Sequence, residues 1–317
     1  MKKILCVLMS CLLFVMAGCS GHSKNLKFGA ADIGGVYYSF ASTFTQLADK
    51  EIDGYTFETK TTAGSVANLR LISDGYIDLA IAQADLLSDA YNATGTFADK
   101  KYQKGYKAVA SLYTECCQIV VRKDSGITGI DDLINKTVGA SESGSEKNAE
   151  QILKMSGITD ELINKVNMDY TEAAEKLKAG EIDAFFCTAG TRTEVIGQLS
   201  KECDICLISL DDKCIDKMLS AYSLCEKYTI PAGTYNGQDS DVTTIGVKAV
   251  LIAKQSLSDD VIKNVTKTIY EHADDFKYAT SLDISFDINT AADGVDIPFH
   301  SGAAAYYTER GINVLTE

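Results

Sequence analysis

The sequence predicts an α/β protein of two similar lobes with mostly parallel sheets. Strand and helix patterns alternate along most of the chain, which is typical of parallel sheets covered by helices. One local pattern occurs twice, at 71–81 and at 177–186: a helix end, a glycine, the pair Ile-Asp and an apolar strand. The length of 317 residues also suits two domains of about 150 residues each.

The first residues predict export rather than a part of the fold. A basic start at 2–3 precedes an uncharged apolar run at 4–17, which is too short to cross a bilayer core of about 30 Å as a helix. Small residues and Cys19 follow this run. We therefore expect 1–18 to be a secretory signal peptide.

The end of this leader resembles a bacterial lipobox, in which the cysteine receives a lipid and becomes the new N-terminus. Met16 stands where such motifs usually have Leu. The resemblance implies lipid attachment at Cys19, a lipidated linker at 19–25 and an extracytoplasmic location, in the periplasm or on the outer face of the cytoplasmic membrane. An ordinary cleaved signal and an uncleaved anchor are the alternatives.

The first lobe is expected to begin with a strand at 26–30. The glycine pair at 34–35 ends this strand, and the helical spacing of Phe40 and Phe44 predicts a helix at 36–50. Gly75 suits the left-handed cap at the end of a later helix. The remaining elements are expected in the order strand 55–61, helix 64–74 and buried-type strand 77–82.

A strand-like segment at 113–122 is expected to carry the chain from the first lobe to the second. The strand–helix alternation then repeats, and it predicts strand 136–140, helix 144–156, strand 166–170, helix 171–179, strand 182–187, helix 191–201 and strand 205–210. The expected division places 26–112 and 242–317 in lobe 1 and 113–241 in lobe 2.

Composition excludes some classes of function. Asp and Glu number 44 against 30 Lys and Arg, giving a formal charge of −14, which argues against a nucleic-acid partner. There are 3 His, and neither an HExxH nor a GxSxG motif occurs, so we expect no enzyme and no cofactor or metal. An extracytoplasmic enzyme remains the rival class.

The cysteines leave several interpretations open. Of the 10 cysteines, Cys6, Cys11 and Cys19 belong to the leader, and an odd number remains in the body. These body cysteines suit one or two disulfides around 203–225, a structural metal, or free thiols that act as small apolar residues. A body rich in free thiols would indicate a low-oxygen habitat.

Two glycine-containing loops of the first lobe are candidates for ligand contact. The loop before helix 36–50 lets a ligand approach the backbone N–H groups of Gly35, Val36 and Tyr37, where the helix dipole favours anions. A plain tight turn is the alternative. Ser65 opens the next helix as an N-cap or as a ligand donor, and Asn68 adds an amide.

Corresponding loops occur in the second lobe. Ser143 and Glu146 fit a capping box, while Gly144 and Ser145 add a backbone cradle and a hydroxyl that suit a carboxylate or phosphate. The loops after the two repeated strands carry Gln83 and Thr188, which would face each other across a cleft. Arg192 lies just beyond Thr188, either as a cation near the ligand or as a residue of the helix surface.

From Lys27 onward the chain resembles the TAXI family, the solute receptors of tripartite ATP-independent (TRAP) transporters. The matching stretches are collinear: 34–38 (GGVYY), 62–70 (TAGSVANLR), 77–83 (IDLAIAQ), 111–113 (SLY), 121–127 (VRKDSGI), 143–146 (SGSE), 182–186 (IDAFF), 230–235 (IPAGTY), and HSGA, YY and ERG within 300–311. Arg192 departs from a proline that is common at its position.

The resemblance implies a two-lobed fold like that of periplasmic binding proteins, with a ligand cleft between the lobes and crossover strands as the hinge. It implies binding of a small anionic solute, of the glutamate, glutamine, dicarboxylate or 2-oxoacid class, and delivery to a TRAP permease. A sensor or antigen-like surface lipoprotein is the alternative. The expected ligand-binding residues are Gly35, Val36, Tyr37, Ser65, Asn68, Gln83, Ser143, Ser145, Thr188, Arg192 and Tyr235.

Overall fold

The structure is a computed structural model that describes residues 23–98, 102, 105–141, 144–280 and 286–317. The predicted signal peptide at 1–18, the predicted lipid site Cys19 and the predicted ligand residue Ser143 lie outside the described residues. Within the described ranges, every helix is too short or too polar to cross a bilayer.

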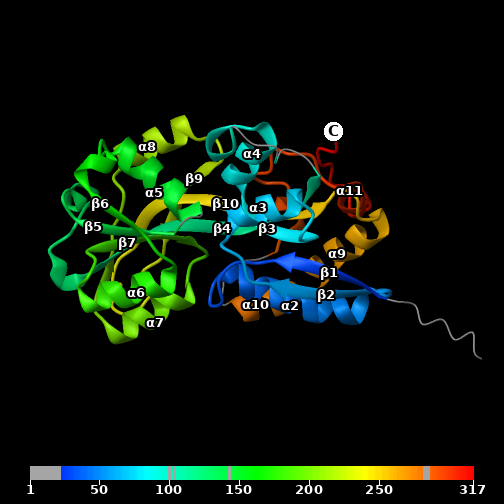
Figure 1. The fold of residues 1–317 in the computed structure, drawn as a ribbon, viewed down its shortest axis with the longest axis horizontal. Coiled ribbons are helices and arrows are strands. Elements are labelled where there is room, and N and C mark those ends of the chain that lie inside the picture. Colours follow the sequence, from blue (N-terminus) through cyan, green and yellow to red (C-terminus); the bar gives the residue numbers. More distant parts are fainter. Residues whose placement is uncertain (1–22, 99–101, 103–104, 142–143, 281–285) are drawn as a thin grey trace, which may run out of the picture.

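A single ten-stranded sheet runs through both lobes (Figure 1). Its strand order is β2-β1-β3-β10-β4-β7-β5-β6, with β8 paired to β4 and β9 paired to β10. Two long strands, β4 (Tyr106–Arg122) and β10 (Val242–Lys254), pass from one lobe to the other. The two-lobed α/β fold predicted from the sequence is confirmed.

Lobe 1 is built on three parallel strands: β1 (Lys24–Gly29), β2 (Tyr55–Lys60) and β3 (Leu79–Gln83). Phe28 of β1 packs edge-on against Phe44, and Phe40 stacks on Phe276 from the C-terminal part, with ring centroids 4.4 Å apart. The helices of this lobe are α2 (Val36–Glu51), α3 (Ser65–Ser73), α4 (Ala84–Asn92), α9 (Asp259–Glu271), α10 (Ala273–Thr280) and α11 (Ser301–Thr308).

Lobe 2 repeats this strand arrangement. Its parallel strands are β5 (Thr137–Ala140), β6 (Asn164–Asn167) and β7 (Ala184–Ala189), with β5 in the middle as β1 is in lobe 1. The other elements are α5 (Gly144–Met155), α6 (Tyr170–Ala179), α7 (Glu194–Glu202), β8 (Ile205–Leu207), α8 (Asp212–Ala221) and β9 (Cys225–Ile230).

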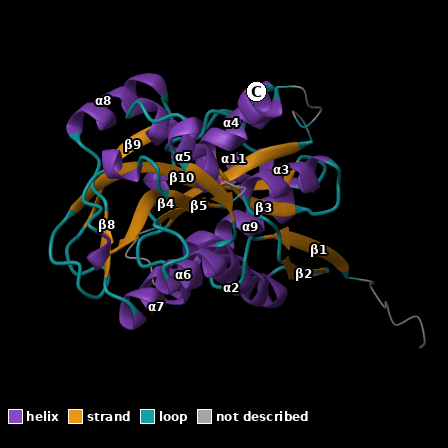
Figure 2. Cartoon of the chain, turned by 60° about the vertical axis from the view of Figure 1, so that its left-hand side comes forward, coloured by secondary structure: helices purple, strands orange, loops and turns teal. Residues whose placement is uncertain are grey.

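Helices cover both faces of the sheet, so that its inner strands are buried on both sides (Figure 2). All five residues of β3 and all six of β7 are buried, as their apolar sequences predict. The helix before each of these strands ends at a glycine with positive φ, +81° at Gly75 and +76° at Gly180. The repeated sequence pattern therefore corresponds to a repeated helix–glycine–strand unit.

The two crossover strands run antiparallel. Gly246 of β10 is paired with Cys116 of β4, and a Cβ atom on Gly246 would stand 2.5 Å from Cγ2 of Thr114. A larger residue at 246 would therefore require the Thr114 side chain to move. The adjacent residue of β4 is Glu115, which faces the space between the lobes.

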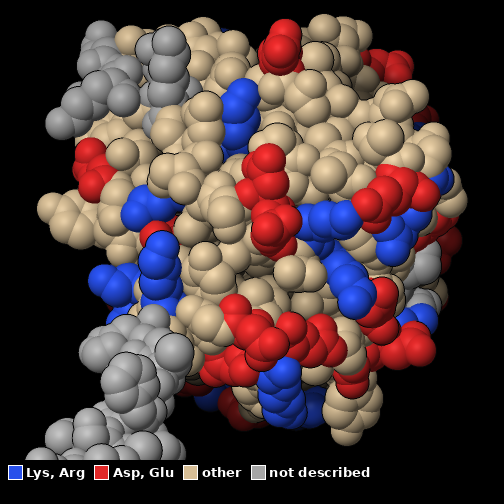
Figure 3. Space-filling model, turned by 90° about the vertical axis from the view of Figure 1, so that its right-hand side faces the viewer, with Lys and Arg blue, Asp and Glu red and all other residues tan. Residues whose placement is uncertain are grey.

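The seven described cysteines are free thiols, and five of them are buried. Burial raises the pKa of Cys117 and of Cys225 to about 12. These side chains therefore serve as small apolar residues of the core. On the face of lobe 1 seen in Figure 3, acidic and basic side chains are interspersed over the surface.

Candidate functional site

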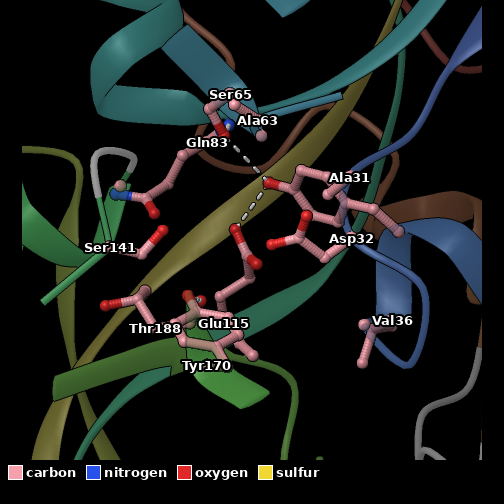
Figure 4. A pocket seen from close by; sticks show the side chains of 15 residues that line it. Ala31, Asp32, Val36, Ala63, Ser65, Gln83, Glu115, Ser141, Tyr170 and Thr188 are labelled. Carbon is pink, nitrogen blue, oxygen red and sulfur yellow. Dashed lines mark hydrogen bonds between the residues drawn. The ribbon is translucent and has the colours of Figure 1, made fainter. Parts of the chain in front are cut away.

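A cavity of about 60 Å³ lies between the lobes, at the point where several strands end and helices begin. A space of this size holds only a few water molecules, so the lobes stand close together. Figure 4 shows side chains from both lobes around it. The lining residues are Ala31, Asp32, Gly35, Val36, Tyr37, Ala63, Gly64, Ser65, Gln83, Glu115, Ser141, Gly144, Tyr170, Thr188 and Ala189.

Two helices of lobe 1 direct uncapped N-termini to this cavity. The N-cap residues are Gly35 for α2 and Gly64 for α3, and neither helix has a side-chain cap. Gly64 has φ +80° and ψ −158°, a backbone conformation that is essentially restricted to glycine. The N–H groups of each first turn therefore remain available to an acceptor in the cavity. Such an arrangement favours a carboxylate or another anion.

The hydroxyl of Tyr37 connects these two helices to the crossover strand β4. It donates a hydrogen bond of 2.7 Å to Oε2 of Glu115, and it lies 3.4 Å from Oγ of Ser65 (Figure 4). Ser65 Oγ in turn accepts a 3.0 Å hydrogen bond from the backbone N–H of Gln83 at the end of β3. Ser65 therefore fixes the end of a strand, while Gly64 occupies the N-cap position.

Lobe 2 carries the same kind of network. Ser145 Oγ contacts the hydroxyl of Tyr170, and it accepts a 2.7 Å hydrogen bond from the backbone N–H of Thr188 at the end of β7. Tyr170 also donates to the carbonyl of Thr188 at 3.1 Å. In both lobes, a tyrosine and a serine from two helix N-termini contact each other, and the serine holds the end of the buried strand next to a crossover strand.

Glu115 is a buried carboxyl group in the wall of the cavity. Its exposed fraction is 4%, and burial raises its pKa to about 8, although the hydrogen bond from Tyr37 lowers it. The charge of Asp85 also raises this pKa. Asp32, from the loop before α2, is the second acidic group of the lining, and its pKa is raised by partial burial and by Asp169.

Polar contacts join the lobes beside the cavity, where α4 and α5 lie side by side (Figure 1). The amide of Gln83 donates to Asn148 Oδ1 at 3.0 Å and to Asp85 Oδ1 at 2.9 Å. Lys147 forms ion pairs with Asp85 at 3.0 Å and with Asp89 at 2.6 Å. Burial lowers the pKa of Lys147, but the two carboxylates outweigh this effect and raise it. The structure is therefore a closed arrangement of the lobes.

The structure brings six of the predicted ligand residues to the cavity: Gly35, Val36, Tyr37, Ser65, Gln83 and Thr188. The Thr188 hydroxyl is buried and makes no hydrogen bond to a described nitrogen or oxygen atom. Ser145 stands behind the wall, where it positions Tyr170 and Thr188.

Three other predicted residues have different positions. The Asn68 amide donates to the carbonyls of Ala30 and Ile81 at 2.6 and 2.9 Å, so it ties strands together outside the cavity. Tyr235 is buried in the core of lobe 2 and donates to Gln118. Arg192 is exposed and lines an adjoining groove.

The sequence interpretation missed Glu115, Tyr170 and Ser141 as lining residues. The signal for Glu115 is the single acidic residue of the strand-like segment 113–122. Its partner Tyr37 is 78 residues away along the chain. For Tyr170, the predicted strand 166–170 includes a residue that begins a helix in the structure.

Two α/β lobes, two crossover strands and a cavity shared by both lobes define the two-lobed fold that periplasmic binding proteins also have. The chain belongs to the NMT1-like family, which matches residues 28–311.

Solved structures with the same fold include three binding proteins or transporters. The aliphatic sulphonate binding protein SsuA from Escherichia coli is 12% identical, with a TM-score of 0.50 over 89% of this chain and 78% of that one. The amino acid ABC transporter substrate-binding protein AbpA from Streptococcus pneumoniae, bound to L-arginine, is 16% identical, with a TM-score of 0.50 over 81% and 94%. A protein described as a periplasmic transporter is 12% identical, with a TM-score of 0.56 over 81% and 86%.

The expected membership of the TAXI family is therefore wrong, and so is the TRAP permease that it implied. The chain matches the NMT1-like family, and its structural neighbours include AbpA, which is described as an amino acid ABC transporter substrate-binding protein. The matching stretches contain residues that the shared two-lobed fold itself requires. Gly64 supplies a glycine-only conformation before α3, and Gly75 supplies a helix end.

Proposed function

We propose that the protein captures a small solute outside the cytoplasm and acts by binding rather than by catalysis. The observation that supports this most directly is the cavity between the lobes, to which α2 and α3 present uncapped N-termini. Their backbone N–H groups suit a solute carboxylate without any net charge on the protein. Neutral groups of Gln83 and Thr188 complete the polar surface.

Closure of the lobes about β4 and β10 accounts for capture. The solute enters while the lobes are apart, and the closed state gains the contacts between α4 and α5 that are seen here. Only contacts that are stronger in the closed state shift the equilibrium toward it. A solute that contacts both Gln83 and Tyr170 supplies such contacts.

The proposed solute class is a small organic acid or an amino acid, including glutamate, glutamine, dicarboxylates and 2-oxoacids. We further propose delivery to a membrane permease of the ABC type, because structural neighbours carry that description. Lipid attachment at Cys19 would hold the protein at the membrane. A Cys19→Ser variant that leaves the membrane fraction while the unmodified protein stays there would support this anchor.

The test of the function is a binding screen on the purified body, residues 23–317. Thermal stabilisation and calorimetry are measured with the twenty common L-amino acids, malate, succinate and 2-oxoglutarate. We expect saturable binding of at least one compound, with no turnover. A flat response to the whole panel, with stabilisation by a sugar or lipid instead, would contradict the proposed class.

The matched variants are Gln83→Ala at the cavity and Gln46→Ala on the exposed surface of α2. Gln83→Ala should weaken binding of the compound identified in the screen, whereas Gln46→Ala should leave it unchanged. Unchanged affinity in Gln83→Ala would remove Gln83 from the solute site.

A further inference from the structure

The charges that line the cavity are of one sign. Among its described lining residues, the ionisable carboxyl groups are Asp32 and Glu115, and Lys and Arg are lacking. The larger hollow of about 350 Å³ that continues from it shares Asp32 and adds Glu175, Glu194 and Glu202. Arg192 and Lys201 line an adjoining groove, which shares Gly35 and Val36 with the cavity. Inside the cavity itself, the ionisable side chains that a solute would meet are carboxyl groups, and the favourable contacts for an anion are the N-termini of α2 and α3.

Glu115 is a buried carboxyl group that no basic side chain of the described residues neutralises. Its side chain is held by Tyr37, and no cation of the described residues contacts it. The ammonium group of Lys147, which joins the lobes beside the cavity, forms ion pairs with Asp85 and Asp89 instead. Several titratable groups interact electrostatically with Glu115. They are Tyr37 of α2, Asp85 of α4, Tyr113 and Cys116 of β4, Tyr170 of α6 and Cys187 of β7. Each is neutral or negative.

A buried carboxylate without a counter-charge is costly, because it loses its hydration and gains nothing in return. The raised pKa of Glu115, about 8, reflects this cost. A ligand cation beside it would remove the penalty. The buried hydroxyl of Thr188, which contacts the Cys117 thiol, offers a further acceptor in the same cavity.

We propose that the solute carries a protonated amine and that this amine binds Glu115. The inference rests on the proposed function and narrows its solute class to amino acids and other amine-bearing acids, at the expense of dicarboxylates and 2-oxoacids. The solute's carboxylate lies at the N-termini of α2 and α3, and its ammonium group lies at the β4 side of the cavity. Both ends of a zwitterion then meet complementary groups.

This assignment has a consequence for protons. Where Glu115 is protonated before binding, the ammonium group displaces its proton, so the affinity should rise by up to about tenfold per pH unit between pH 5 and 8. It should level off above pH 8. The charges of most α-amino acids are constant over this range, so the slope reports the protein.

The experiment compares each L-amino acid with the 2-hydroxy acid of the same side chain, for example L-glutamate with L-2-hydroxyglutarate and L-alanine with L-lactate. Calorimetry is carried out on the body at pH 5, 6.5 and 8, in buffers of different ionisation enthalpy. We expect the best amino acid to bind at least tenfold more tightly than its hydroxy acid, and to release a proton below pH 8.

Glu115→Gln keeps the size of the side chain and removes its charge. In this variant, the affinity for the amino acid should fall at least tenfold at pH 8, the preference over the hydroxy acid should disappear, and the proton release should vanish. Asp212→Asn, at an exposed position of α8, removes the same charge from the whole molecule and should change none of these values. A thermal unfolding curve checks that both variants are folded.

The outcomes separate the two proposals. Equal binding of hydroxy and amino acids, or an undiminished amino-acid affinity in folded Glu115→Gln, overturns the amine assignment and leaves solute capture intact. Stabilisation by Na⁺, K⁺ or Ca²⁺ alone that depends on Glu115 would also overturn it, because an inorganic cation would then be the partner. If no compound of either series binds, both the solute class and the amine assignment fail.

Discussion

The side-chain amide of Gln83 donates a 3.0 Å hydrogen bond to Oδ1 of Asn148, and so joins the end of β3 in lobe 1 to α5 in lobe 2. The end of β3 and the start of α5 come so close here that a Cβ atom on Gly144 would overlap the Gln83 side chain, at 1.8 Å from its Oε1. Closure of the lobes is therefore limited by a glycine and secured by polar contacts.

Lys147→Met should shift the ligand-free protein toward an open arrangement. The change leaves Asp85 buried without its cation in the closed state, at a cost of up to about 3 kcal/mol, whereas the open state hydrates Asp85. Small-angle scattering should show a larger radius of gyration. Lys165→Met is the control, because Lys165 pairs with Glu146 and Glu150 within lobe 2. An unchanged radius in Lys147→Met would show that these ion pairs do not hold the lobes together.

Tyr37→Phe should destabilise the protein more at pH 9 than at pH 5. Its hydroxyl stabilises the ionised form of Glu115, whose pKa is about 8, so the contact is worth more when the carboxyl is charged. A hydrogen bond to a charged group contributes about 1.5–3 kcal/mol. Urea unfolding at the two pH values measures the difference. Tyr278→Phe is the control at a side chain that is 90% exposed, and equal losses at both pH values would contradict the contact.

Asn68→Ala should destabilise lobe 1 by about 2–4 kcal/mol, because it leaves buried carbonyl groups without their donor. The identity of the preferred solute should not change, since Asn68 lies outside the cavity. Urea unfolding gives the first value, and a binding screen gives the second. Asn92→Ala, in the exposed last turn of α4, serves as the matched control. A changed solute preference would return Asn68 to the site.

His272 should make the stability depend on pH. Its ring contacts Asp275 at 2.9 Å and also Glu51 of α2, and the hydrogen bond to Asp275 is the main cause of its raised pKa. A group with a raised folded-state pKa stabilises fully below its unfolded pKa, about 6.5, and loses this contribution as the pH rises through the folded value. Chemical denaturation from pH 5.5 to 9 should show the loss.

In His272→Gln, this part of the pH dependence should disappear. Glu115 also lowers the stability as the pH rises, between about 4.5 and 8, because its pKa is raised in the folded state. The difference between the wild-type and His272→Gln curves separates the contribution of His272 from that of Glu115. Parallel curves for the two proteins would show that the His272 contacts contribute nothing.

Most elements of the fold could be predicted from local pattern. The helix expected at 36–50 is α2, Val36–Glu51, and the strand expected at 55–61 is β2, Tyr55–Lys60. Glycines at helix ends and uniformly apolar strands leave little choice of local structure. The part 242–317 was expected in lobe 1, but the bounds of its helices were not predicted, because their place is set by packing such as that of Phe276 on Phe40.

The site was predictable where it depends on helix N-termini and strand ends, and not where it depends on contacts between distant segments. Gly35, Ser65 and Gln83 could be found from their loops. Glu115 could not be assigned, because its burial depends on β10 and its hydrogen bond on α2. The structure places Asn68 on backbone carbonyls outside the cavity, which the sequence could not show, since an amide suits a ligand and a backbone carbonyl equally well.

The tyrosine–serine networks of the two lobes use the same parts in exchanged positions. By strand order, α2 corresponds to α5 and α3 to α6. Tyr37 therefore stands at the position of Ser145, and Ser65 at the position of Tyr170, so the two residue types are exchanged between the lobes. Either arrangement meets the same mechanical demand, which is to fix the end of the buried strand next to a crossover strand.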